Sequence, residues 1–276
     1  MRLLSAFSIR LFALVLCISC AVPAATLERA LNRMYNFDFN GADQEMNSYI
    51  AGHPEDPLGY TFRASALLFR ELDRLSILEA EFFSSNKRVM SEKKLIPDAK
   101  LKDRFLAAIE QSKAMARARL VANTYETNAL FALCLNAGLI TDYMGLIEKR
   151  QLGSLAHAKE SHSYAVKLLK IDPGYTDAYL TTGLTEYLLG TVPFFVKWFV
   201  RFEEAEGNKT VAVERLKAVV DRGKYLGPFA KILLAIIDVR EKRPLAAEMK
   251  LAELSRDFPE NSLFKKELEK LRPKLR

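Results

Sequence analysis

The sequence lacks the residues around which most catalytic and metal centres are built. It has 3 histidines and 3 cysteines among 276 residues, and beyond residue 24 it contains neither a Cys-x-x-Cys pair nor a glycine-rich phosphate loop. His157 and His162 are five positions apart, whereas two metal ligands on one helix are spaced by three or four. Ser161, beside His162, has no acidic residue at a spacing that predicts a catalytic triad. We therefore expect no enzymatic activity, no metal and no cofactor.

Acidic residues before a glycine turn do not make a calcium site either. Glu203, Glu204 and Glu206 precede Gly207, but the alternating carboxylates of a calcium loop are missing. We interpret them as a charged helix end and turn. His53 lies before a proline in another turn and carries no pattern of a ligand set.

The first 24 residues have the features of a secretory signal peptide. Arg2 and Arg10 make the start basic, residues 11–22 form an apolar run too short for a stable membrane anchor, and a small-x-small pattern ends at Ala24. We expect cleavage after Ala24. The mature domain then covers residues 25–276 and is exported, to the periplasm or to an outer-membrane-associated site.

Three other interpretations of this end remain open. Cleavage after Ala25 is one, and a buried N-terminal helix is another. The third is a lipoprotein modified on Cys20, where only Ser19 of the three preceding residues fits a lipidation motif. Removal of the signal peptide leaves Cys134 alone, so no internal disulfide forms, and we expect Cys134 to be a small buried apolar residue.

Charge of one sign is not concentrated along the chain. The formal net charge is +7, or +5 once Arg2 and Arg10 are removed, and basic and acidic residues interleave over most of the sequence. This argues against a nucleic-acid surface. A local basic loop (Lys87, Arg88, Lys93 and Lys94) is interpreted as a solvated connector, with contact to anionic lipid or an acidic partner as the alternative.

Strand-like alternation is almost absent, and helical periodicity dominates. Glycine and proline are few and mark the ends of segments in which apolar residues recur three and four apart. We expect no later transmembrane segment, and an all-α fold of about ten to twelve helices in antiparallel pairs. The expected helices cover residues 26–37, 41–51, 58–84, 99–123, 125–149, 153–171, 177–189, 210–222, 228–241, 244–257 and 262–271, with a polar break at 85–97.

Two stretches end with the same pattern of a small residue, two large residues and a proline. The first has Ala42, Met46, Tyr49 and Pro54, and the second has Ala247, Leu251, Leu254 and Pro259. The small residue permits a close helix contact, the large residues fill the groove beside it, and the proline stops the helix. The pattern is typical of the second helix of a helical-hairpin repeat.

The repeat resembles the tetratricopeptide repeat. Residues 228–261 have its 34-residue length, with Leu234-Ala235, Ala247 and Pro259 at its usual positions, although Lys231 and Asp238 stand where aromatic residues are common. The resemblance implies an α-solenoid of stacked antiparallel hairpins with a concave binding surface.

The C-terminal part is similar to one subgroup, the eukaryotic inclusion-clearance family of tetratricopeptide-repeat proteins. The similarity rests on Gly183-x-x-x-Tyr187, Pro193 with the apolar run after it, Glu206 to Lys209, and Phe258 to Phe264. It implies a helical protein without catalytic residues that handles lipid-associated protein deposits. The export signal is incompatible with that family's intracellular role.

The aromatic run at residues 193–202 is the candidate binding segment. It contains the single tryptophan, and a helix that starts at Pro193 would place the aromatic residues on one broad face and both cations away from it. We expect a short, mostly buried helix packed on Tyr187 and the helix from residue 210, with a membrane-interface helix as the alternative. The candidate partner- or lipid-binding residues are Phe194, Phe195, Lys197, Trp198, Phe199, Arg201 and Phe202.

These features predict an exported, non-enzymatic scaffold that binds a protein or peptide partner in the cell envelope. A peripheral membrane or lipid-handling protein is the alternative.

Overall fold

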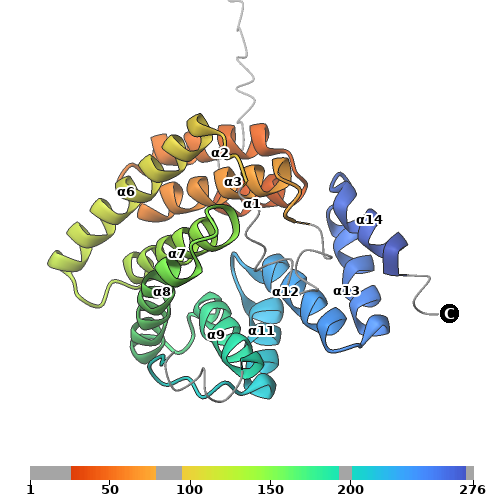
Figure 1. Cartoon of the computed structure of the whole chain (residues 1–276). Helices are drawn as coiled ribbons and strands as arrows, with labels where there is room; N and C mark the ends of the chain where they lie inside the picture. Colours follow the sequence, from red (N-terminus) through yellow and green to blue (C-terminus); the bar gives the residue numbers. More distant parts are fainter. Residues whose placement is uncertain (1–25, 79–94, 193–200, 272–276) are drawn as a thin grey trace, which may run out of the picture.

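The computed structural model describes residues 26–78, 95–192 and 201–271, and this part of the chain is all-α without strands (Figure 1). The predicted fold class is therefore confirmed. The expected signal peptide at 1–24 and the basic residues 87–94 lie outside the described residues. The α-helices are α1 Leu27–Tyr35, α2 Phe39–Gly52, α3 Pro57–Arg74, α6 Ala99–Ala122, α7 Thr127–Asp142, α8 Gln151–Ile171, α9 Tyr179–Thr191, α11 Lys209–Arg222, α12 Gly227–Arg240, α13 Pro244–Asp257 and α14 Ser262–Leu271.

Consecutive helices pack as hairpins, and each hairpin packs on the next. Over the described residues the pairs are α1–α2, α3–α6, α7–α8, α9–α11 and α12–α13, and α14 covers the last of them. A main cluster of buried apolar side chains runs through all five pairs, and a smaller one lies between α3, α6 and α7. Each amphipathic helix thus buries its apolar side against a sequence neighbour, as in a helical repeat array.

One turn recurs between hairpins. The residue after the second helix accepts, through its carbonyl oxygen, a hydrogen bond from the backbone N–H three residues later. The pairs are His53–Asp56 at 3.0 Å, Asn123–Glu126 at 3.1 Å, Asp172–Tyr175 at 3.1 Å and Phe258–Asn261 at 3.2 Å. Asp56 and Asn261 then cap the next helix by accepting the N–H of Leu58 and Leu263, each at 3.0 Å. Four junctions of one local geometry define the hairpins as repeats of a single unit.

The array curls until its last hairpin contacts its first (Figure 1). Asn261 is 2% exposed and donates from Nδ2 to the carbonyl oxygen of Tyr35 at 2.8 Å. The rings of Tyr35 and Phe258 lie 5.4 Å apart, and the N–H of Glu260 donates to the side chain of Asn36 at 3.2 Å. The solenoid is therefore closed by side chains from both ends of the described chain.

The inner side of this curl is filled by the protein's own aromatic residues. Tyr225, before α12, packs on Phe62 of α3 at 5.1 Å and lies 6.4 Å from Phe131 of α7. Phe69 of α3 meets Phe229 of α12 edge to face at 5.6 Å. An open concave groove, expected from the repeat pattern, is not available along these contacts, because residues of α12 already occupy the inner face of α3.

Most helix ends agree with the sequence prediction to within a few residues, but α3 ends ten residues early. The leucine stripe predicts a helix to residue 84, whereas α3 ends at Arg74. Ser76 has a φ of 56°, and the N–H groups of Ser76 and Ile77 bond back to Asp73 and Leu72 at 2.8 and 2.9 Å. This is a left-handed helix stop made without glycine. The periodic leucines continue past it, which is why the sequence does not reveal it.

Helix α7 continues into a π-helical turn, Tyr143–Ile147. The combined helix Thr127–Ile147 is long and apolar enough to span a membrane, which corrects the expectation that no such segment follows the signal peptide. More than half of its most apolar stretch is buried inside the protein. Its side chains pack in the core with α3, α6 and α8. A core helix of a folded domain satisfies the same criteria of length and composition.

Asp142, immediately before this turn, supports a prediction about pH. Burial raises the pKa of this partly buried carboxyl to about 7, so the folded state holds a proton that the unfolded chain releases near pH 4. Stability should therefore fall as pH rises from about 4 to about 7. We expect Asp142→Asn to raise the free energy of unfolding by about 1–2 kcal/mol at pH 8. At pH 4 the two proteins should match. Equal urea midpoints at both pH values would contradict this.

Ala247 tests the helix contact predicted from the repeated pattern. Ala42 and Ala247 are both 0% exposed, on the second helices of the first and last hairpins. Leucine at Ala247 would crowd the α12–α13 contact, and we expect a loss of about 1–3 kcal/mol in the free energy of unfolding. Ala252→Leu, at an exposed position of the same helix, is the matched control and should change stability little. Urea unfolding of both variants checks this, and equal effects would contradict the packing.

Candidate functional site

The structure describes only the end of the predicted aromatic segment. Phe194, Phe195, Lys197, Trp198 and Phe199 lie outside the described residues, so the expected helix and its packing on Tyr187 stay a prediction. Arg201 is exposed and Phe202 is partly buried.

Phe202 is placed by a buried histidine. Its ring meets the His162 imidazole of α8 edge to face, with centroids 5.5 Å apart. His162 Nε2 lies 2.7 Å from the carbonyl oxygen of Glu203 and Nδ1 lies 3.1 Å from the hydroxyl of Thr185. A carbonyl only accepts, so Nε2 carries a proton. Burial lowers the pKa of His162. The residue is thus a neutral anchor for this segment at pH 7.

A second anchor fixes the turn that leads into α11. Glu186 of α9 is 4% exposed, and one of its carboxylate oxygens accepts the N–H groups of Gly207 and Asn208 at 2.7 and 2.8 Å. Lys170 pairs with Glu203 at 3.3 Å and Glu204 at 2.7 Å. These acidic residues form a charged turn, and the segment is tied to α8 and α9 on its C-terminal side.

The other residues with potential for chemistry are not brought together. His53 is exposed and stacks on Tyr49 at 4.3 Å, whereas His157 lies 3.5 Å from Glu160. Cys134 is fully buried, as expected, and burial raises the pKa of its thiol. Among the residues that the structure describes, no three His, Cys, Asp or Glu side chains are close enough to hold a metal ion.

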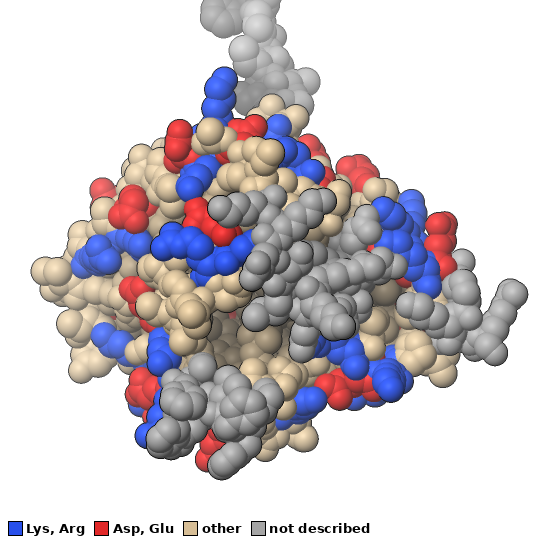
Figure 2. Space-filling view, viewed as in Figure 1, with Lys and Arg blue, Asp and Glu red and all other residues tan. Residues whose placement is uncertain are grey.

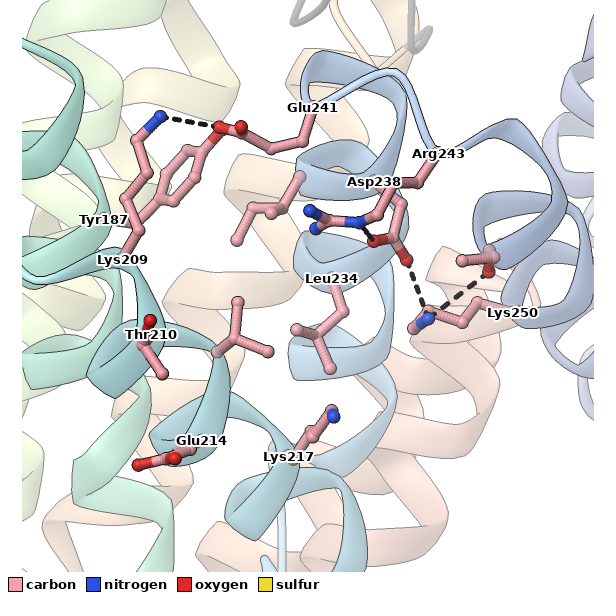
Figure 3. Close-up of a pocket in the computed structure, with 13 residues that line it drawn as sticks. Tyr187, Lys209, Thr210, Glu214, Lys217, Leu234, Asp238, Glu241, Arg243 and Lys250 are labelled. Atoms are coloured by element: carbon pink, nitrogen blue, oxygen red, sulfur yellow. Dashed lines mark hydrogen bonds and ion pairs between the residues drawn. The ribbon is translucent and has the colours of Figure 1, made fainter.

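A surface groove of about 500 Å³ lies between α11, α12 and α13 (Figure 3). Helix α12 forms its floor with Leu234 and Ile237, which are 4% and 3% exposed. Val213 of α11 and Ala246 of α13 add apolar surface to its two walls, and Tyr187 of α9 lies at one end. No sequence motif marks this site, because each helix supplies only a few of its residues.

The rim of the groove carries ion pairs. Lys209 of α11 contacts Glu241 of α12 at 2.7 Å, and Glu241 also accepts the Tyr187 hydroxyl at 3.2 Å. Lys209 holds the pKa of Glu241 below its usual range. Asp238 is shared by Arg243 at 2.9 Å and Lys250 at 2.7 Å. The site therefore combines an apolar floor with charged walls.

On the face shown in Figure 2, basic and acidic side chains are interleaved and do not gather into one field. A second shallow groove of about 500 Å³ lies on the other side of α11, between Arg222 and the loop at Pro173 and Gly174. Helix α11 is thus exposed between two recesses.

Comparison with known proteins adds no assignment: no family model matches this chain, and no curated protein or solved structure matches it.

Proposed function

We propose that this chain is an exported, non-enzymatic scaffold of the tetratricopeptide-repeat type that binds a protein or peptide partner in the cell envelope. The observation that carries the proposal is the groove over α12, whose apolar floor and charged walls have the composition of a recognition site. The stacked hairpins and their recurring turn support the repeat assignment. The basic start, short apolar run and Ala24 site support export.

The groove, rather than the inner face of the solenoid, is the surface we assign to the partner. The inner face of α3 is covered by Tyr225 and Phe229. The groove instead is lined by neither of these residues, and its walls come from α11 and α13, the second helices of two successive hairpins. A segment lying over Leu234 and Ile237 would contact α11 and α13 at once.

The test is affinity capture from envelope fractions of the native host, quantified by mass spectrometry. Thr210 is exposed and lines the groove, so Thr210→Trp should block the groove without disturbing the core. Ser163→Trp, at an exposed position of α8, is the matched control. We expect a protein retained by the wild type and the control to be lost with Thr210→Trp. Identical captured sets for all three proteins would contradict the proposal.

The peripheral-membrane alternative depends on the aromatic run at 193–202. Trp198 is the only tryptophan, so its fluorescence reports on that segment alone. A blue-shifted, quencher-protected spectrum without lipid supports burial of the segment in the protein. A solvent-like spectrum that shifts only when vesicles are added would place lipid binding first.

A further inference from the structure

Formal charge is divided between the two parts of the array. Among the described residues, positions 209–271 carry 14 Lys and Arg against 10 Asp and Glu, a net of +4. The described residues before 209 carry 17 against 21, a net of −4. The helices that build the groove therefore carry an excess of positive charge, whereas the other described residues have a negative net charge, which favours acidic partners on this side.

Within the groove, cations outnumber the carboxylates among the lining residues. Asp238 is a single carboxylate between two cations, Arg243 and Lys250. On the opposite wall Lys217 is exposed, and no ion pair of Lys217 is formed within the described part of the chain. Figure 3 shows the ammonium groups of Lys217 and Lys250 on two sides of the Leu234 side chain. An anionic group above Leu234 would meet cations from both walls.

The shape and lining distinguish a peptide from a membrane. The α11 residues that line the groove run from Lys209 to Lys217, about 12 Å of helix, so the groove has room for two to three helical turns or a short extended segment. A flat bilayer surface does not enter such a recess. Glu214, Asp238 and Glu241 also line it and would repel a dense layer of lipid phosphates, whereas a peptide can place carboxylates and apolar side chains at separate points.

We propose that the occupant of the groove is an acidic, amphipathic segment of a partner protein. Its carboxylates bind between Lys217 and the Arg243–Lys250 pair, and its apolar side chains cover Leu234 and Ile237. This inference rests on the proposed function and adds the chemistry of the partner to it. Lys217 acts as the specificity residue, because it is the wall cation that no acidic group of the described chain neutralises.

The test is fluorescence anisotropy with a fluorescein-labelled amphipathic peptide of leucine and glutamate, about 15 residues long so that a helix of it exceeds the groove. A leucine–lysine peptide of the same pattern is the charge control. We expect saturable binding of the acidic peptide that weakens as salt is raised. Lys217→Glu should raise its Kd by at least about fivefold. Lys167→Glu, an exposed α8 lysine without an ion pair among the described residues, should change the Kd by less than about twofold.

Three results would overturn the inference. The first is equal binding of the two peptides, and the second is an equal loss of affinity for the acidic peptide with Lys217→Glu and Lys167→Glu. The third is that neither peptide binds, whereas phosphatidylglycerol vesicles bind and Lys217→Glu abolishes that binding. Both variants should keep the wild-type melting temperature, because both lysines are exposed. If capture remains sensitive to Thr210→Trp but the acidic peptide fails, the scaffold function stands and the acidic chemistry is wrong. If capture is insensitive to Thr210→Trp and the acidic peptide does not bind, both the scaffold function at the groove and the acidic chemistry of its partner are wrong.

Discussion

Replacing Asp177 by alanine is expected to lower the free energy of unfolding by about 3–5 kcal/mol, a larger loss than we expect from changes at Ala247 or Asn261. Asp177 is 3% exposed and accepts backbone N–H groups of the turn before α12. The distances are 2.9 Å to Lys224, 3.2 Å to Tyr225 and 2.8 Å to Leu226. Alanine would leave two buried donors, those of Tyr225 and Leu226, and the partly buried donor of Lys224 without an acceptor.

At the junction between α11 and α12, the Asp177 carboxylate takes the place of the backbone hydrogen bond that closes the turn at the other junctions. The fourth hairpin ends at Gly223, and a Cβ there would lie 2.5 Å from the Val219 carbonyl oxygen and 2.8 Å from Asp177 Oδ1. Asp177→Asn keeps one acceptor oxygen and should lose less stability than alanine. Urea unfolding of both variants measures the difference. A loss below about 1 kcal/mol for alanine would show that water replaces the carboxylate.

Loss of Asn261 is the second large expected effect. Its Nδ2 donates to the Tyr35 carbonyl, 226 residues away in sequence, and its Oδ1 caps α14 through the N–H of Leu263. We expect Asn261→Ala to cost about 2–4 kcal/mol, because it removes a helix cap and leaves a buried carbonyl without a donor. Asn261→Ser keeps a cap acceptor but cannot reach Tyr35, so it should cost about half as much.

Hydrogen exchange separates closure of the array from ordinary repeat stability. In an open solenoid, a change at the last hairpin affects its neighbours only. In the closed array, Asn261→Ser should increase amide exchange in α1 as well as in α13 and α14. Increased exchange confined to α13 and α14 would contradict the closure.

The sequence predicts the parts of the fold that local signals determine. Most helix boundaries follow glycine, proline and apolar spacing, and Ala247 marks a real helix contact. The predicted end of α3 is wrong, because a serine rather than glycine takes the left-handed position. The turn at Asn123 is predicted correctly, between expected helices 99–123 and 125–149, although it lacks the proline that marks those at Pro54 and Pro259.

Contacts between distant residues are not predictable in this way. Asp177 meets its partners 47 to 49 residues later, and Asn261 meets Tyr35 across the whole array. Neither carries a motif. The groove is not predictable from the sequence for the same physical reason, because its floor comes from α12 and its walls come from α11 and α13. The sequence signal that does exist is the excess of basic residues after position 208, which the net charge of the whole chain does not locate.

The groove and the aromatic segment share one support. Glu186 holds the turn before α11, and Tyr187, the next residue of α9, lies at one end of the groove. The positions of α11 and of the 201–208 stretch are therefore set by the same helix. A partner in the groove would therefore contact the same helix, α9, that holds the 201–208 stretch. For this reason Trp198 fluorescence should be recorded with and without the acidic peptide.

The most direct test of the central claim is photo-crosslinking in the native host, with a photoreactive amino acid placed at Thr210 in the groove or at Ser163 on α8. Both positions are exposed on helices, so they differ chiefly in location. We expect a discrete adduct with an envelope protein from position 210 and none from 163. The adduct should weaken when Lys217→Glu is added. Adducts from 163 alone, or equal adducts from both positions, would contradict the assignment of the groove as the binding site.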